Sequence, residues 1–143
     1  MMRIRRSLVC LSLLFTACIK PGWNSISDPE KAFQAIFYME RPISVRILDY
    51  GFFEYRTLFL SADKWIWYMK FSADQDFIEK IKRSKFGLQL SQDSTLEPRE
   101  KIPSSFFPRD LKHHIIMKSE DGKMIFVEDS INHLVYMSDS GYQ

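Results

Sequence analysis

Cysteine is nearly absent from this chain of 143 residues, which contains two, Cys10 and Cys18, both close to the N-terminus. The residues after Cys18 can therefore form no disulfide and supply no thiol nucleophile. Glycine is also scarce, and the five glycines form no G-x-G array, so no phosphate-binding glycine loop is indicated. No apolar run reaches the length of about 20 residues that a membrane-spanning helix needs.

The first 18 residues have the layout of a secretory signal peptide. Three arginines precede an uncharged, largely apolar run over residues 7–15, and small residues follow. Residues 15–18 (FTAC) resemble the lipobox of bacterial lipoproteins, which usually begins with Leu where Phe15 stands here. The resemblance implies cleavage before Cys18, a diacylglycerol on the Cys18 thiol and an acylated new N-terminus. The alternative is an ordinary cleaved signal peptide.

This interpretation divides the chain into three parts: a helical signal peptide (1–17), the lipidated cysteine with a tether (18–27), and one domain (28–143). Cleavage would leave 17 basic and 18 acidic residues, a net charge of −1. A near-neutral domain lacks the basic surface that nucleic-acid binding requires and the polybasic excess that holds proteins on anionic lipid. The apolar fraction of 45% and the aromatic fraction of 15% exclude a disordered chain.

The tether is short. Residues 19–27 contain Pro21-Gly22, which breaks regular structure, and nine residues reach at most about 30 Å. The domain is therefore expected close to its membrane. Trp23, within the tether, is either an interfacial aromatic or a cap on the domain's core, and the usual burial of large apolar residues favours the cap.

Apolar residues at helical spacing predict two helices. Ser27 or Asp28 can cap the first, and Ser72 with Gln75 has the composition of a capping box for the second. The expected helices cover residues 28–39 and 72–84.

Alternating or β-branched and aromatic segments predict the strands. Gly51 is expected as a turn or bulge between the first two strands, and Asp121-Gly122 as a hairpin turn between two later ones. Residues 64–71 form the heaviest strand, which is expected near the middle of the sheet, while the polar tail 138–143 is expected to fray. The predicted strands are residues 43–50, 52–60, 64–71, 113–118, 123–128 and 133–138, with a short strand around Leu90.

The order of elements predicts an α+β domain. Short hairpin connections favour antiparallel pairing, so we expect an antiparallel sheet of about five strands with both helices on one face. The other face then needs a cover, which is either the long proline-containing loop over residues 91–110 or a partner protein.

Histidines are the first candidates for chemistry. His113 and His114 would point to opposite faces of a strand and cannot easily bind one ion together, although His133 could lie beside one of them. Histidines at a solvated strand end are favoured over a structural zinc site, so no metal is expected.

The sequence names no catalytic set. It contains no G-x-S-x-G elbow, and Ser104-Ser105 is the only serine pair worth checking. The neighbouring acids Asp74 and Asp76, like Glu120 and Asp121, lie where caps and turns are expected. We therefore expect no enzyme and no cofactor.

Aromatic residues are the remaining candidates. Trp65, Trp67 and Tyr68 could stack on a sugar or peptide, but core packing is the favoured interpretation. Phe106 and Phe107 are consecutive in a proline-bounded loop, where one could plug the open sheet face while the other lies at the surface. Together with Arg109 they have the composition of an interface hot spot, although both rings could also be tucked beneath the loop.

The sequence therefore predicts a small lipoprotein of the bacterial envelope that acts by binding, with the membrane as partner through Cys18 and a protein as a candidate second partner. It would face the periplasm or the cell surface. The residue after Cys18 is Ile19 and not Asp, which favours the outer membrane by resemblance to the sorting of enteric lipoproteins. The alternatives are an immunity or inhibitor lipoprotein against a toxin or cell-wall enzyme, and a small hydrolase.

Overall fold

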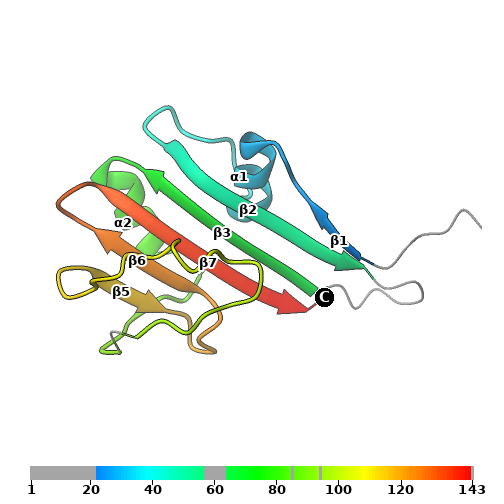
Figure 1. Cartoon of the computed structure of the whole chain (residues 1–143). Helices are drawn as coiled ribbons and strands as arrows, with labels where there is room; N and C mark the ends of the chain where they lie inside the picture. The colour runs from blue at the N-terminus through cyan, green and yellow to red at the C-terminus, as the bar shows by residue number, and fades with distance from the viewer. Residues whose placement is uncertain (1–21, 57–63, 85, 94, 143) are drawn as a thin grey trace, which may run out of the picture.

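The computed structural model describes residues 22–56, 64–84, 86–93 and 95–142; the expected signal peptide and Cys18 lie outside this range. Within these described residues, one antiparallel sheet of seven strands carries two helices (Figure 1). The α+β class is confirmed, while the expected number of about five strands is too low. In chain order the elements are β1 (Gly22–Ser25), α1 (Pro29–Phe37), β2 (Arg46–Arg56), β3 (Lys64–Ser72), α2 (Gln75–Lys82), β4 (Gln89–Leu90), β5 (Ile115–Lys118), β6 (Ile125–Asp129) and β7 (Leu134–Tyr142).

The sheet has the strand order β1-β2-β3-β7-β6-β5-β4, so β3 and β7 pair near its centre. The position of β3 agrees with the prediction for residues 64–71. Its side chains alternate between two cores: Met69 and Phe71 pack on one face of the sheet, and Tyr68 packs on the other. Because both faces of β3 are covered, the sheet supports a core on each side.

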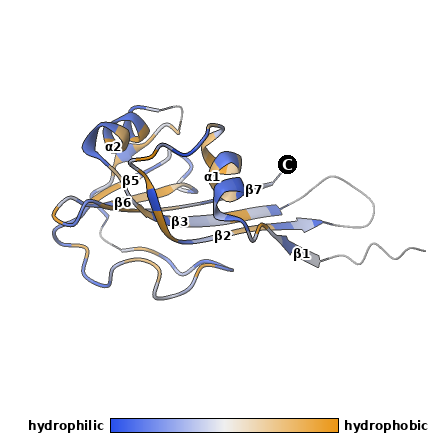
Figure 2. Ribbon diagram, turned by 90° about the horizontal axis from the view of Figure 1, so that it is seen from above, coloured by the Kyte–Doolittle hydropathy of each residue, from blue (hydrophilic) through white to orange (hydrophobic). Residues whose placement is uncertain are grey.

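Both helices cover the same face of the sheet (Figure 2), as predicted. Asp28 caps α1, its carboxylate accepting from the backbone N–H of Glu30 at 2.9 Å. Asp74 caps α2 by accepting from the N–H of Phe77 at 2.8 Å. The predicted capping box of Ser72 and Gln75 is wrong, because Ser72 is still paired in the sheet as the last residue of β3.

The long loop between β4 and β5 covers the opposite face, running in front of β5, β6 and β7 in Figure 1. The sheet contributes buried side chains such as Tyr68 and Tyr136, and the loop contributes Phe106. Four further apolar side chains of the loop pack against this second core: Leu96, Ile102, Phe107 and Leu111. The loop therefore covers this face of the sheet. The sequence had left open whether the loop or a partner protein would do so.

Gly51 does not separate two strands. β2 runs continuously through Gly51, and its irregularity lies earlier, between Ile47 and Asp49. A Cβ on Gly51 would lie 2.5 Å from Tyr68 Cε1 and 2.7 Å from Phe53 Cε2. The glycine therefore makes room for two aromatic rings on the strand surface, and the predicted break at this position is wrong. The expected extension of this segment to residue 60 enters residues 57–63, which the structure does not describe.

Two other segments expected to be irregular are strands. Residues 22–25 of the expected tether form β1, which pairs with β2 from Gly22 opposite Arg56 to Ser25 opposite Phe53. The tail that was expected to fray belongs to β7, which pairs with β3 as far as Tyr142 opposite Lys64. In both segments backbone pairing with a long neighbouring strand gives order that the local sequence does not indicate.

The hairpin between β5 and β6 forms where Asp121-Gly122 predicted it. Gly122 has a φ of +70°, which a glycine adopts without steric cost, and the Asp121 carboxylate accepts from the N–H of Lys123 at 3.0 Å. The strand expected from residue 113 begins only at Ile115, because His114 donates its backbone N–H to the carbonyl of Leu111 in a preceding turn.

A buried ion pair joins α2 to the sheet. Lys82 Nζ lies 2.5 Å from Glu128 Oε2 and 2.8 Å from Glu79 Oε1. The Glu128 side chain is only 1% exposed. Burial alone would lower the pKa of Lys82, but the hydrogen bonds to Glu128 and Glu79 outweigh it, and the pKa is raised. Lys82 therefore remains charged and neutralises the carboxylate beneath the helix.

We expect Lys82→Met to lower the free energy of unfolding by about 3–5 kcal/mol, because Glu128 would be left buried without its counter-ion. Urea denaturation at neutral pH measures this. Arg83→Met is the matched control, since Arg83 is the next residue and its side chain is 82% exposed. Equal losses of stability in the two variants would contradict the role given to the buried pair.

Candidate functional site

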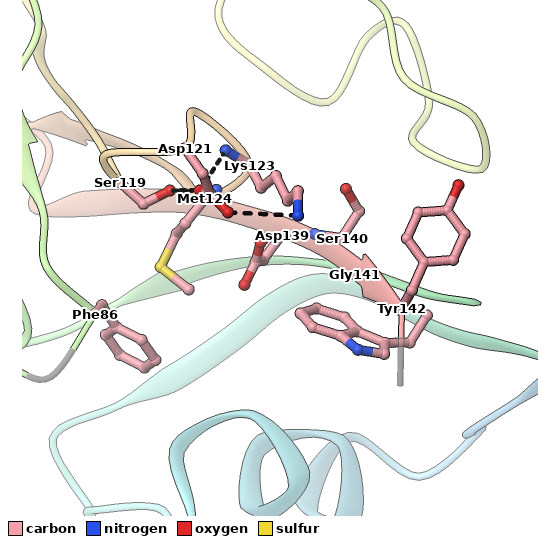
Figure 3. A pocket seen from close by; sticks show the side chains of 10 residues that line it. Phe86, Ser119, Asp121, Lys123, Met124, Asp139, Ser140, Gly141 and Tyr142 are labelled. Atoms are coloured by element: carbon pink, nitrogen blue, oxygen red, sulfur yellow. Dashed lines mark hydrogen bonds and ion pairs between the residues drawn. The ribbon is translucent and has the colours of Figure 1, made fainter. Parts of the chain in front are cut away.

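A hollow of about 380 Å³ opens on the helix-covered face of the sheet, beside the end of β7 (Figure 3). Trp65, Phe86 and Met124 supply its apolar surface. Its polar groups include Asp139 from β7, with Asp121 and Lys123 from the β5–β6 hairpin. The hollow thus combines aromatic surface with carboxylates, a composition typical of small-molecule and side-chain binding sites.

Trp65 is exposed to the hollow because the residue opposite it is a glycine. Trp65 on β3 pairs directly with Gly141 on β7. A Cβ on Gly141 would lie 2.5 Å from Cζ2 of the Trp65 indole. The indole therefore lies against the bare backbone of β7, and it lines the hollow as a half-buried ring.

Asp139 lies on the same face of the sheet, because it pairs with Trp67, whose side chain packs in the helix-side core. Its Oδ1 accepts from the backbone N–H of Ser140 at 2.7 Å. Burial raises the pKa of the Asp139 carboxyl to about 6, and the negative charge of Asp121 adds to this effect. The Ser140 N–H, Arg99 and Lys123 act in the opposite direction without cancelling it. Asp139 can therefore gain or lose a proton near neutral pH.

Arg99, from the long loop, holds the hairpin that forms one wall of the hollow. Its guanidinium donates to the carbonyl of Gly122 at 2.7 Å and to the carbonyl of Lys123. Burial lowers the pKa of Arg99, although Asp139 and Asp121 favour its charged form. The loop that covers one face of the sheet thereby fixes the position of groups that open on the other.

The residues proposed from the sequence for binding lie elsewhere. Phe106 is 5% exposed, and its ring centroid is 4.8 Å from that of Tyr68. Phe107 is half-buried and packs edge-on against Phe106, while Arg109 is exposed. Phe106 is therefore a core residue, and a binding role of this segment stays a prediction that involves Phe107 and Arg109. Cys18 lies outside the described residues.

The three histidines lie at the other end of the sheet from the hollow. His114 Nε2 is 3.8 Å from Asp129 Oδ2, and His133 lies in the turn before β7 with a φ of +54°. Ser119 and Ser140 line the hollow without a neighbouring histidine, so a Ser-His-Asp triad is not assembled there. Ser104 and Ser105 are exposed on the loop. Within the described ranges, no three His, Cys, Asp or Glu side chains are arranged to hold a metal ion.

Comparisons with known proteins add no family: no family model matches the chain, and no curated protein or solved structure is similar enough to count as a match. No helix in the described part of the chain is long and apolar enough to cross a membrane.

The sequence indicates Trp65 as a possible stacking platform but does not indicate Asp139 as a site residue. Trp65 was expected in the core, and the structure leaves it only partly buried at the margin of the helix-side cluster. Asp139 lies in a polar segment, where an aspartate carries no signal of burial. Its position is set by pairing with β3 and could be found only after β7 is known to continue to Tyr142.

We expect Phe106→Ala to lower the free energy of unfolding by about 3–5 kcal/mol, because it removes an aromatic side chain from a buried core. Phe107→Ala should cost clearly less, since that ring is partly exposed. Urea denaturation of the two variants measures the difference. A larger loss for Phe107→Ala would show that the two rings have exchanged roles.

The raised pKa of Asp139 predicts a pH-dependent effect of Asp139→Asn. The folded state holds the proton up to about pH 6 and the unfolded state only up to about pH 4, so burial of Asp139 costs stability as the pH rises through that window. The variant should gain stability over the wild type at pH 8 and lose this advantage at pH 4. The gain should be of order 1 kcal/mol, because one pKa unit is worth about 1.4 kcal/mol and solvent screens a partly exposed group.

Urea denaturation of both proteins at both pH values tests this prediction. Asp93→Asn is the control, because hydrogen bonds from Thr95 and Lys118 lower the pKa of Asp93 to about 2. That variant should show no gain at pH 8. An Asp139→Asn effect that is the same at both pH values would contradict the assigned pKa.

Proposed function

We propose that this protein is an envelope-anchored lipoprotein that acts by binding, and that its ligand occupies the hollow beside Trp65. The anchor rests on the signal-peptide layout and the lipobox-like residues 15–18. The observation that supports the binding site is the pairing of a half-buried indole with a partly buried carboxylate in one open hollow. Perturbed pKa values and pockets that combine apolar surface with a few polar groups cluster at functional sites.

The chemistry of the hollow favours a ligand with a cationic or hydroxyl-rich group. An indole face attracts ammonium and guanidinium groups and also stacks on the apolar faces of sugars. The Asp139 carboxylate can accept hydrogen bonds from either kind of group. A cation should bind more tightly above pH 6, where Asp139 is ionised, and this pH dependence distinguishes it from a neutral sugar.

Binding is preferred to catalysis for the same hollow. A carboxyl group that titrates near pH 6 suits acid–base chemistry, but a hydrolase also needs a nucleophile or an activated water. The serines of the hollow have no histidine beside them, since all three histidines lie at the far end of the sheet. The arrangement is therefore better suited to holding a ligand than to cleaving one.

Recovery of bound molecules from the native envelope tests this function. The acylated wild-type protein would be crosslinked in cells, purified and analysed by mass spectrometry for proteins and small molecules. We expect recovery to fall for Trp65→Leu and for Asp139→Asn. Tyr38→Leu and Asp49→Asn are the matched controls, because both residues are exposed and neither lines the hollow. Thermal unfolding would confirm that each variant is folded.

Equal recovery from all four variants would refute the assignment of the hollow. A Cys18→Ala variant that remains in the membrane fraction would refute the lipid anchor. A toxin or a wall-degrading enzyme among the recovered partners would assign the inhibitor role.

A further inference from the structure

Very little chain separates Cys18, the proposed anchor, from the folded domain. β1 begins at Gly22, so only Ile19, Lys20 and Pro21 lie between Cys18 and the sheet. Four Cα–Cα steps of about 3.8 Å span about 15 Å at most. The nine residues of β3 extend about 30 Å at about 3.3 Å per residue. The tether is therefore shorter than the domain, and one end of the sheet must lie nearest the membrane.

Strand pairing identifies that end. Gly22 pairs with Arg56 at the end of β2, Tyr55 pairs with Lys64 at the start of β3, and Lys64 pairs with Tyr142 at the end of β7. In Figure 1 the start of β1 and the C-terminal end of β7 lie at the same end of the sheet. The opposite end carries the histidines and the start of β2.

Aromatic and basic side chains gather at this end, which we call the anchor-side end. Trp23 packs on Tyr55 with ring centroids 5.4 Å apart, and Tyr142 is 73% exposed. The Nζ atoms of Lys101 and Lys64 lie 5.0 and 5.8 Å from the centroid of the Trp23 ring. Trp23 is half-buried and packs on Tyr55 outside both core clusters of the described residues, so its role as a cap on the core stays a prediction.

We propose that the anchor-side end rests on the lipid headgroups, with Trp23, Tyr142 and Lys101 in contact with an anionic bilayer surface. Tryptophan and tyrosine are the side chains that membrane proteins concentrate at the headgroup level. A lysine close to an anionic bilayer surface is attracted to it electrostatically. This inference depends on the proposed lipid at Cys18, because the surface itself is too weakly charged to recruit the protein.

The charges of this end can orient the protein on a bilayer, but they are too nearly balanced to recruit it from solution. Glu100 lies 2.6 Å from Lys64, and Glu54 lies 3.0 Å from Arg56, so these two cations are already neutralised. Lys101, beside the Trp23 ring, adds a further positive charge at this end. The anchor provides the affinity, and the aromatic rings with Lys101 select the face that meets the bilayer. Trp65 pairs with Gly141, the residue next to Tyr142 on β7, so in this orientation the hollow opens close to the headgroups.

Site-specific labelling can test this orientation. With Cys18 acylated, a cysteine introduced after it is the only free thiol of the mature chain. Tyr142→Cys and Ile43→Cys would each carry an environment-sensitive fluorophore. Tyr142 lies at the anchor-side end, whereas Ile43 is fully exposed and precedes β2 at the opposite end. The acylated proteins would be reconstituted in vesicles of phosphatidylethanolamine and phosphatidylglycerol that contain brominated lipid.

We expect quenching of the label at position 142 to exceed that at position 43 several-fold. Adding Trp23→Ser and Lys101→Glu to the Tyr142→Cys protein should remove most of this excess. Flotation of the vesicles separates the two proposals. Protein that floats with equal quenching at both positions would overturn the orientation alone, whereas protein that fails to float would overturn the anchor and the orientation with it.

Discussion

The pairing of β3 with β7 is the constraint on which the rest of the structure depends. Nine residue pairs join the two strands, from Lys64 opposite Tyr142 to Ser72 opposite Leu134. Since successive side chains leave a strand on opposite faces, this pair sends apolar groups into both cores. Met69 and Met137 meet on the helix side, and Tyr68 lies opposite Ser138 on the loop side. Cover on both faces is therefore a requirement of the central strands, and the helices and the long loop each meet it on one side.

Two glycines let aromatic rings approach the backbone of this central part of the sheet closely. Gly51 lies beneath Tyr68 and Phe53 on one face, and Gly141 lies beneath Trp65 on the other. A side chain at either glycine would meet carbon atoms at 2.5 Å, so the ring would have to move. At Gly51 the ring becomes part of a closed core. At Gly141 the same close approach leaves a half-buried indole that lines the hollow beside Asp139.

The parts of the fold that were predictable are those in which local pattern and tertiary environment agree. The alternation in KWIWYMKF identified β3 and its central place. Asp121-Gly122 identified the hairpin between β5 and β6, because a positive φ at Gly122 is a local requirement. The failures share a different cause. Gly51 signals a break unless the overlying rings are known, and the polar residues after Met137 signal a frayed end unless β3 is known to be available for pairing.

The candidate site was hidden for the same reason as β1 and the end of β7. Asp139 has no local feature that distinguishes it from a solvated aspartate, and its burial follows from the pairing of β7 with β3. Trp65 could be recognised as a possible platform, but its partner Gly141 is 76 positions away in the sequence. Long-range pairing thus created the hollow, and a pattern confined to one segment could not reveal it.

The pairing of β1 connects the site to the proposed anchor. Without β1 the tether would comprise nine residues and allow the domain to turn freely about 30 Å from Cys18. Pairing of Gly22–Ser25 with the end of β2 removes most of that length and fixes the direction from which the chain enters the sheet. The direction is that of the end of β7, where Gly141 and Asp139 form part of the hollow. If Cys18 carries the proposed lipid, this four-residue edge strand, too short to add much to the core, determines how far the hollow can lie from the bilayer.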